Sequence, residues 1–178
     1  MGLEIRPASL SDLEIVRALA ERIWPECYGA MLPAGQVRYM LDWMYAPHRL
    51  RSEWGRGVRY RLALLEGRPV GYLAWERESG ADAAFLNKLY LVTELQGRGL
   101  GQEMIASVHR EVSAEGARYL ELRVNRQNGK AIRAYERAGF VVVQTLVTDI
   151  GAGFEMDDFL MRLELERASS VGASGIPA

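Results

Sequence analysis

The sequence has little of what metal, disulfide and membrane proteins need. Its 178 residues include one cysteine and two histidines. A lone thiol, Cys27, has no partner for an internal disulfide, and no Cys/His cluster has zinc-ligand spacing. The N-terminus carries charged residues where a signal peptide would be apolar, and no run reaches transmembrane length. We therefore expect a cytoplasmic protein without a metal.

An excess of charge of either sign is also missing, because Lys plus Arg number 22 and Asp plus Glu number 23. Without a broad positive field, the chain is not expected to bind nucleic acid or an anionic membrane. A hydrophobic content of 49% at this length fits a single domain with one sizeable core. We place this domain at residues 1–166. The tail 167–178, rich in Ser, Gly and Ala, has too little apolar surface to pack and is expected to be flexible.

Hydrophobic periodicity predicts the order of elements, because alternation indicates strands and 3.6-residue spacing indicates helices. A short strand and two helices come first, followed by three strands, a helix, a strand, a helix and two last strands. The strands are predicted at 3–6, 60–65, 70–76, 84–92, 119–124, 140–148 and 159–165, and the helices at 9–24, 37–44, 100–116 and 128–138. This order predicts an α/β or α+β domain with a mixed sheet flanked by helices.

A glycine-rich loop lies at the centre of the chain. It reads Gln96, Gly97, Arg98, Gly99, Leu100, Gly101 and Gln102, after a predicted strand and at the start of a predicted helix. Backbone N–H groups at a helix N-terminus have no helical partner and favour an anion. Glycines let phosphate oxygens approach the backbone, and the arginine adds positive charge. The loop therefore predicts a site for a diphosphate.

Spacing separates the nucleotide-binding motifs that such a loop suggests. A P-loop needs Lys and then Ser or Thr after its last glycine, whereas Gln102 and Glu103 follow Gly101 here. A dinucleotide fingerprint needs its third glycine at position 102 and its loop in the first strand-to-helix turn. Glu121 does lie about 20 residues beyond the loop, where a ribose-binding acid would be. A dinucleotide-binding oxidoreductase therefore stays as a remote alternative.

The third interpretation is a resemblance to a known family. The loop resembles the Q/R-x-x-G-x-G/A motif with which the GNAT family of N-acetyltransferases binds the pyrophosphate of acetyl-CoA. Asn125, Asn128 and the segment AIRAYERAGF at 131–140 are similar to that family's asparagine, helix and Y-E-x-x-G-F segment. The resemblance implies a GNAT-like fold over residues 3–165. Such a fold has a mixed, mostly antiparallel sheet of six to seven strands, about four helices, and splayed strands at the cofactor site.

The same resemblance implies acetyl-CoA as the cosubstrate. Its implied contacts are the strand residues Leu89, Tyr90 and Leu91, the loop residues Gln96 to Gln102 quoted above, and Asn125, Asn128 and Tyr135. Where strands splay, backbone N–H and C=O groups lose their partners, so the amides of the pantetheine arm can pair with them. A backbone N–H near Leu91 is then placed to stabilise the tetrahedral oxyanion.

The resemblance also implies catalytic roles. Tyr135 is the implied general acid, which protonates the departing CoA thiolate. Reference pKa values near 10 for tyrosine and about 8.5 for a thiol make full transfer uphill by roughly 2 kcal/mol, so a strong hydrogen bond suffices. Some relatives use a glutamate as base where this sequence has Arg123. Glu121, on the same strand face, is our candidate base, with a water chain as the alternative.

Direct attack by the amine in a ternary complex is the expected route. The only cysteine lies far from the loop in the sequence, and no Ser/His/Asp arrangement is evident. The chain is thus predicted to transfer the acetyl group of acetyl-CoA to a primary amine. A protein N-terminal or lysine acetyltransferase and a non-catalytic acyl-CoA-binding module are the alternatives.

Two segments bear on the acceptor. Residues 28–33 and 153–158 resemble a bacterial subgroup that includes spermidine- and spermine-acetylating members, so a polyamine or another small-molecule amine is expected. The acidic run 155–158, predicted as a loop before the last strand, would attract a cationic amine. Dimers are common among proteins of this resemblance, and a homodimer is accordingly an expectation.

Overall fold

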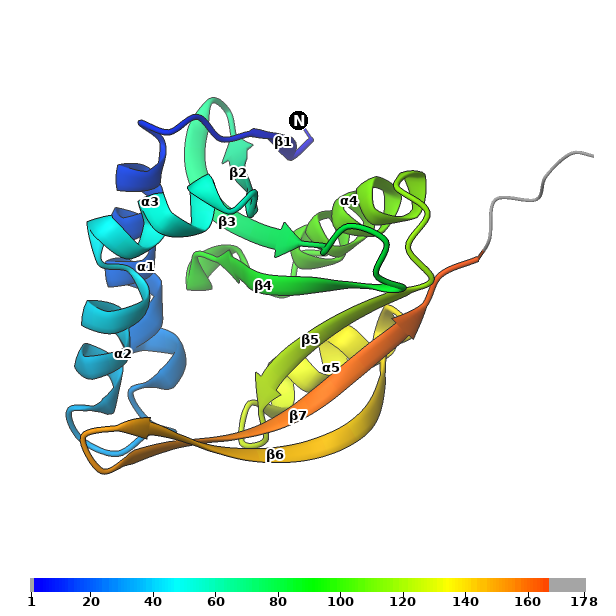
Figure 1. The fold of residues 1–178 in the computed structure, drawn as a ribbon. Helices are drawn as coiled ribbons and strands as arrows, with labels where there is room; N and C mark the ends of the chain where they lie inside the picture. Colours follow the sequence, from blue (N-terminus) through cyan, green and yellow to red (C-terminus); the bar gives the residue numbers. More distant parts are fainter. Residues whose placement is uncertain (1, 167–178) are drawn as a thin grey trace, which may run out of the picture.

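Seven strands form one mixed sheet in the order β1-β2-β3-β4-β5-β7-β6 (Figure 1). The computed structural model describes residues 2–166, so the predicted tail 167–178 lies outside the described residues. The strands are β1 (Glu4–Pro7), β2 (Arg59–Leu65), β3 (Arg68–Glu76), β4 (Ala83–Leu91), β5 (Tyr119–Asn125), β6 (Val141–Gly151) and β7 (Phe154–Glu164). Only β4 and β5 pair in parallel. The predicted mixed, mostly antiparallel sheet is confirmed.

Helices cover both faces of this sheet. They are α1 (Leu13–Tyr28), α2 (Gln36–Met44), α3 (Pro47–Gly55), α4 (Leu100–Ala114) and α5 (Gly129–Arg137), with a short 3₁₀ turn, η1 (Thr93–Leu95). The sequence did not predict α3, because Pro47 also fits the end of the preceding helix. Proline fits the first turn of a helix, where its missing N–H would be unpaired in any case.

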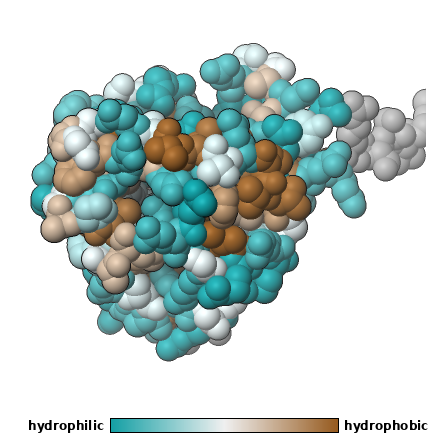
Figure 2. Space-filling model, turned by 90° about the horizontal axis from the view of Figure 1, so that it is seen from below, coloured by the Kyte–Doolittle hydropathy of each residue, from teal (hydrophilic) through white to brown (hydrophobic). Residues whose placement is uncertain are grey.

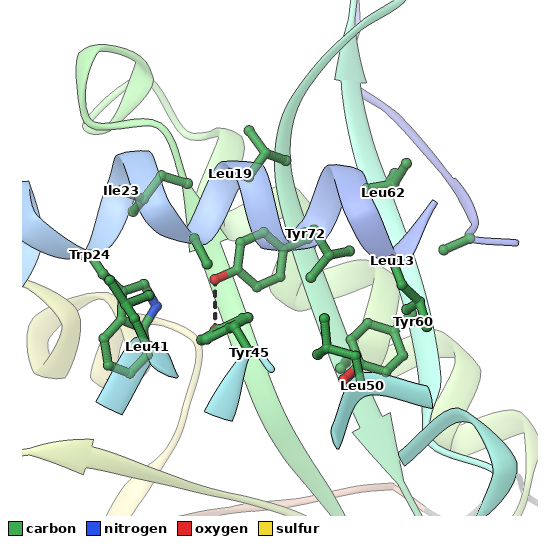
Figure 3. Packing of buried hydrophobic residues seen from close by; sticks show 14 of the residues in the cluster. Leu13, Leu19, Ile23, Trp24, Leu41, Tyr45, Leu50, Tyr60, Leu62 and Tyr72 are labelled. Atoms are coloured by element: carbon green, nitrogen blue, oxygen red, sulfur yellow. Dashed lines mark hydrogen bonds between the residues drawn. The ribbon is translucent and has the colours of Figure 1, made fainter. Parts of the chain in front are cut away.

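Two hydrophobic clusters lie on opposite faces of the sheet. One packs α1, α2 and α3 against alternate residues of β2 and β3, including Leu62 and Tyr72. Figure 3 shows its centre, where the hydroxyls of Tyr45 and Tyr72 lie 2.7 Å apart and form a hydrogen bond. The other cluster packs α4 and α5 against the intervening residues, such as Leu73 and Trp75. This alternation follows from the two-residue period of a strand.

Two boundaries differ from the prediction in ways that affect the site. Helix α1 continues through Pro25 to Tyr28, one turn beyond its predicted end. Strand β7 begins at Phe154, so the acidic run 155–158 is part of a strand and not the loop that we expected. Both differences place side chains from these segments on regular secondary structure.

Candidate active site

The parallel strands β4 and β5 part halfway along their length. Their pairing runs only from Ala83 opposite Tyr119 to Leu86 opposite Leu122. At this point β4 also bulges against β3, because Trp75 pairs with Leu86 and Ala74 with Lys88, which leaves Asn87 as the extra residue. Beyond the bulge, the edge of β4 that faces β5 has no strand partner. The splayed strands expected from the family resemblance are therefore present.

A cavity of about 800 Å³ opens where the two strands part. Its wall combines the end of β4, the glycine loop, α5 and the last turn of α1. Most of the residues predicted to contact the cosubstrate line it, namely Leu89, Tyr90, Leu91, Gln96, Gly97, Gly99, Gly101, Gln102, Asn128 and Tyr135. The predicted residues Arg98, Leu100, Asn125 and Glu121 are not among its lining residues.

The glycine loop is held in place by its two glutamines. The Gln96 side-chain amide donates to the carbonyl oxygen of Leu91 at 3.0 Å, which connects the loop to β4. The Gln102 amide donates to the carbonyl of Ala134 in α5 at 2.8 Å. Gly99 precedes α4 with a φ of 84°, a left-handed conformation that favours glycine. The unpaired N–H groups at the start of α4 are thus presented by a fixed backbone.

Tyr135 lies on the α5 side of the cavity. Asn128 caps this helix by accepting a hydrogen bond from the N–H of Ala131 at 3.1 Å, and the Tyr135 ring packs against Phe140. Burial, with a smaller contribution from the nearby Tyr28, raises the pKa of Tyr135 well above its ordinary value. The hydroxyl therefore stays protonated and is able to donate a hydrogen bond into the cavity.

An aromatic group from α1 and β4 forms the opposite wall. The hydroxyls of Tyr28 and Tyr90 lie 3.1 Å apart and form a hydrogen bond, and both rings pack near Trp24. Burial raises the pKa of Tyr28 to about 12, so its hydroxyl is neutral. The sequence did not identify Tyr28 as a site residue, although it lies in the segment that resembles polyamine acetyltransferases.

Cys27 also lines the cavity, contrary to the expectation from its sequence position. Its sulfur lies 3.9 Å from the side-chain nitrogen of Gln96, so α1 brings it next to the loop. Burial raises the pKa of the thiol, which disfavours the reactive thiolate. Cys27 therefore lies close to the loop, and the expectation that it lies far away is wrong. Its thiol is nevertheless a poor nucleophile, because it is neutral.

Three cationic side chains that the sequence did not identify as cofactor contacts line the cavity: Arg123, Lys130 and Arg137. They come from β5 and α5, which flank the glycine loop. Cations beside unpaired N–H groups at a helix N-terminus form a setting that suits phosphate groups. No sequence motif marks these residues, because only the packing of α5 beside the loop brings them together.

Glu121, the predicted base, forms an ion pair with a residue of β7. It lies directly opposite Arg162 of β7, whose Nε donates to its Oε1 at 2.7 Å. Its position on β5 is in the part that still pairs with β4, before the strands diverge. The structure therefore does not bring this predicted base together with Tyr135.

Neither a metal site nor a membrane span emerges from residues 2–166. In this part of the chain, no group of three or more His, Cys, Asp or Glu side chains is arranged to hold a metal ion. No helix there is both long enough and apolar enough to cross a membrane.

Sequence comparison relates the chain to acetyltransferases. The family model described as the acetyltransferase (GNAT) family matches residues 17–140. A spermidine N(1)-acetyltransferase of Thermoplasma acidophilum is 24% identical over 171 residues, 93% of this chain and 99% of that protein. An uncharacterized N-acetyltransferase of Mycobacterium bovis is 33% identical over 156 residues, 86% of this chain and 98% of that protein.

Solved structures show the same fold. The PaiA N-acetyltransferase of Thermoplasma acidophilum, in complex with coenzyme A, superposes with a TM-score of 0.79 at 24% identity, covering 92% of this chain and 99% of that one. A GCN5-related N-acetyltransferase of Rhodopseudomonas palustris gives a TM-score of 0.78 at 18% identity, covering 93% and 97%.

Proposed function

Because this chain belongs to the GNAT family of acetyl-CoA-dependent N-acetyltransferases, we propose that it acetylates a small cationic amine, with a polyamine as the acceptor. The observation that carries the proposal is the cavity between the parted ends of β4 and β5, with a protonated tyrosine on one wall. Its volume lies within the usual range of ligand pockets, roughly 300–1,000 Å³.

The described residues fit acetyl-CoA in three places. The N–H groups from Gly97 to Gly101, with Lys130 and Arg137 nearby, suit the phosphates. The free edge of β4 suits the amides of the pantetheine arm, which supply the hydrogen-bonding groups that a neighbouring strand would otherwise provide. The thioester then lies near Leu91 and Tyr135, at the middle of the sheet.

In this arrangement Tyr135 stabilises the leaving group. Its raised pKa makes complete proton transfer to a thiolate harder than the reference values imply, so hydrogen-bond donation to the sulfur is its main contribution. A backbone N–H near Leu91 supports the oxyanion. The neutral Cys27 thiol favours direct attack by the amine without an acetylated enzyme.

Two observations favour a polyamine over a protein acceptor. A relative that aligns along nearly the whole chain is named a spermidine N(1)-acetyltransferase. On the α1 side, the wall combines the aromatic faces of Tyr28 and Tyr90 with the carboxylate of Glu26. Aromatic faces and carboxylates both attract alkylammonium groups.

Two further features of the protein are proposed on separate grounds. We propose a homodimer that forms along the exposed, apolar edge strand β6. We also propose a cytosolic location, since the single cysteine is a free thiol beside the candidate site, which suits a reducing compartment.

The test combines ligand binding and turnover. Thermal unfolding is measured with acetyl-CoA, CoA and NAD, because a ligand that binds only the native state raises the melting temperature. Stabilisation by acetyl-CoA and CoA, followed by thiol release with spermidine but not with a lysine-containing peptide, supports the proposal. Acetyl-CoA binding without thiol release from any amine would favour the non-catalytic module, and a response to NAD alone would favour the oxidoreductase.

A further inference from the structure

One buried carboxylate near the candidate site has no partner. Asp158 of β7 is only 2% exposed. Within residues 2–166, its carboxylate takes part in no hydrogen bond or ion pair, whereas its neighbour Asp157 pairs with Arg126. A buried charge without a partner is costly, and such residues concentrate at functional sites.

The strand register places Asp158 beside the divergent end of β5. It lies directly opposite Asn125, the last residue of β5, beyond the point where β4 and β5 separate. Phe159 and Met161 pack in the cluster under α4 and α5, whereas Met156 packs in the cluster under α1 and α2. Because side chains alternate along a strand, Asp158 points to the same face as Met156.

Tyr28 connects Asp158 to the cavity. This tyrosine lines the cavity from the last turn of α1, and the charge of Asp158 contributes, after burial, to its raised pKa. Tyr28 in turn contributes to the raised pKa of Tyr135. Asp158 and Tyr135 are therefore both within electrostatic range of Tyr28.

On the basis of the proposed function, we propose that Asp158 receives the ammonium group of the acceptor and removes its proton as the general base. The alkylammonium group binds beside Tyr28, where an anion is present and aromatic rings exclude water. This assignment replaces a direct role for Glu121, whose carboxylate is already paired with Arg162.

In the proposed acetyl transfer, both protons that the ammonium nitrogen loses are accounted for. The ammonium group gives one proton to Asp158, and the lone pair of the neutral amine forms the C–N bond to the thioester carbonyl carbon. The C–S bond breaks, and its electron pair leaves with sulfur. The Tyr135 hydroxyl stabilises the thiolate by donating a hydrogen bond, and the thiolate takes up the second proton lost from nitrogen. The products are one amide, one CoA thiol and the proton that Asp158 releases to water.

The surroundings of Asp158 give the expected pH dependence. Burial raises the pKa of Asp158 to about 6; the charge of Arg123 lowers it and that of Asp157 raises it. Tyr28 of α1, which is close enough to interact with this carboxylate, is neutral at these pH values. A base must be ionised to accept a proton, so kcat/KM should rise with pH through an apparent pKa near 6.

The test compares Asp158→Asn with Asp157→Asn, which removes the adjacent, exposed carboxylate. Thiol release is measured with acetyl-CoA and spermidine across the pH range, and acetyl-CoA binding is measured by calorimetry. We expect Asp158→Asn to lose roughly 10²–10⁴-fold in kcat and the rise near pH 6, with unchanged acetyl-CoA affinity. Asp157→Asn should keep the wild-type kcat.

Stability provides an independent readout. The raised pKa means that Asp158 favours folding below about pH 4, and this contribution is lost as the pH rises through about 6. Asp158→Asn should then be at least as stable as the wild type at pH 7.5 in thermal unfolding. A structural aspartate would show the reverse result.

The outcomes separate the two proposals. An Asp158→Asn enzyme with wild-type kcat and an intact rise near pH 6 overturns the role of Asp158 and leaves the acetyltransferase in place. A wild-type protein that binds acetyl-CoA but acetylates no amine overturns the proposed function, and the base assignment with it.

Discussion

At the scale of single residues, Tyr135 is the group whose chemistry the cavity controls most directly. Burial keeps its hydroxyl protonated, and it lines the cavity in which we propose that the thiolate forms. We expect Tyr135→Phe to lower kcat by about 10²-fold or more, because the leaving group loses its donor. The ring stays, so the affinity for acetyl-CoA should change little. Thiol release and calorimetry measure the two quantities, and unchanged kcat across the pH range would remove Tyr135 from the mechanism.

Cys27 allows a test of the direct-attack route. Its thiol lines the cavity, but burial raises its pKa. We expect Cys27→Ser and Cys27→Ala to keep most of the wild-type turnover, because no acetyl group passes through sulfur. Intact-protein mass spectrometry of the wild type mixed with acetyl-CoA should show no acetylated enzyme. Loss of turnover in both variants together with an acetyl adduct would contradict this.

At the scale of elements, the turn into α4 determines where the unpaired N–H groups point. Gly99 has a φ of 84°, and a β-carbon built there meets nothing within 4 Å. Gly99→Ala should therefore strain the backbone by about 1–2 kcal/mol without a steric clash, and the strain should move the N–H groups. We expect weaker acetyl-CoA binding and a lower melting temperature.

Gly80 provides the matched control for this variant. It has a φ of 77°, its β-carbon would also meet nothing within 4 Å, and it lies in the turn between β3 and β4, outside the cavity lining. Gly80→Ala should lose similar stability but keep the wild-type affinity for acetyl-CoA. Equal loss of affinity in both variants would show that the effect comes from general destabilisation.

Local patterns were sufficient to predict some elements but not others. The loop and the start of α4 follow from glycines that occupy neighbouring positions, so the sequence locates them well. The bulge at Asn87 and the parting of β4 from β5 depend on which distant strand pairs with each residue. No short window of sequence contains that information.

The acidic run shows how tertiary context overrides composition. Aspartate and glutamate are depleted in strands, so residues 155–158 suggested a loop. Their pairing with β6, and that of Asp158 with Asn125 in β5, makes them a strand instead, and this places Asp158 opposite the last residue of β5. Likewise, Cys27 is distant from Gln96 in sequence and adjacent to it only because α1 packs across β4.

At the scale of the whole molecule, β6 is a sheet edge with exposed apolar side chains. Val141 is 61% exposed and Val147 is 62% exposed. Figure 2, which views the molecule from the side where β6 lies, shows apolar patches among hydrophilic residues. Edge strands that carry no charge are prone to pair with another chain. This stretch of β6, from Val141 to Thr148, has no charged residue.

We therefore expect a dimer in light-scattering measurements, and a monomer when Val141 and Val147 are both replaced by lysine. Leu10→Lys is the control, because Leu10 is 53% exposed but lies outside β6. That variant should stay dimeric. A wild-type protein that is monomeric at high concentration would contradict the proposed dimer.

The short pairing between β4 and β5 also has a mechanical consequence. Within residues 2–166, the strand pairing between the half-sheet β1–β4 and the half-sheet β5–β7 consists of only four residue pairs. A ligand that forms hydrogen bonds along the free edge of β4 would extend the hydrogen-bonded contact between the two half-sheets and stabilise it. Binding of acetyl-CoA should therefore slow amide hydrogen exchange in both β4 and β5. The cosubstrate would then stabilise the contact between the two half-sheets for as long as it stays bound.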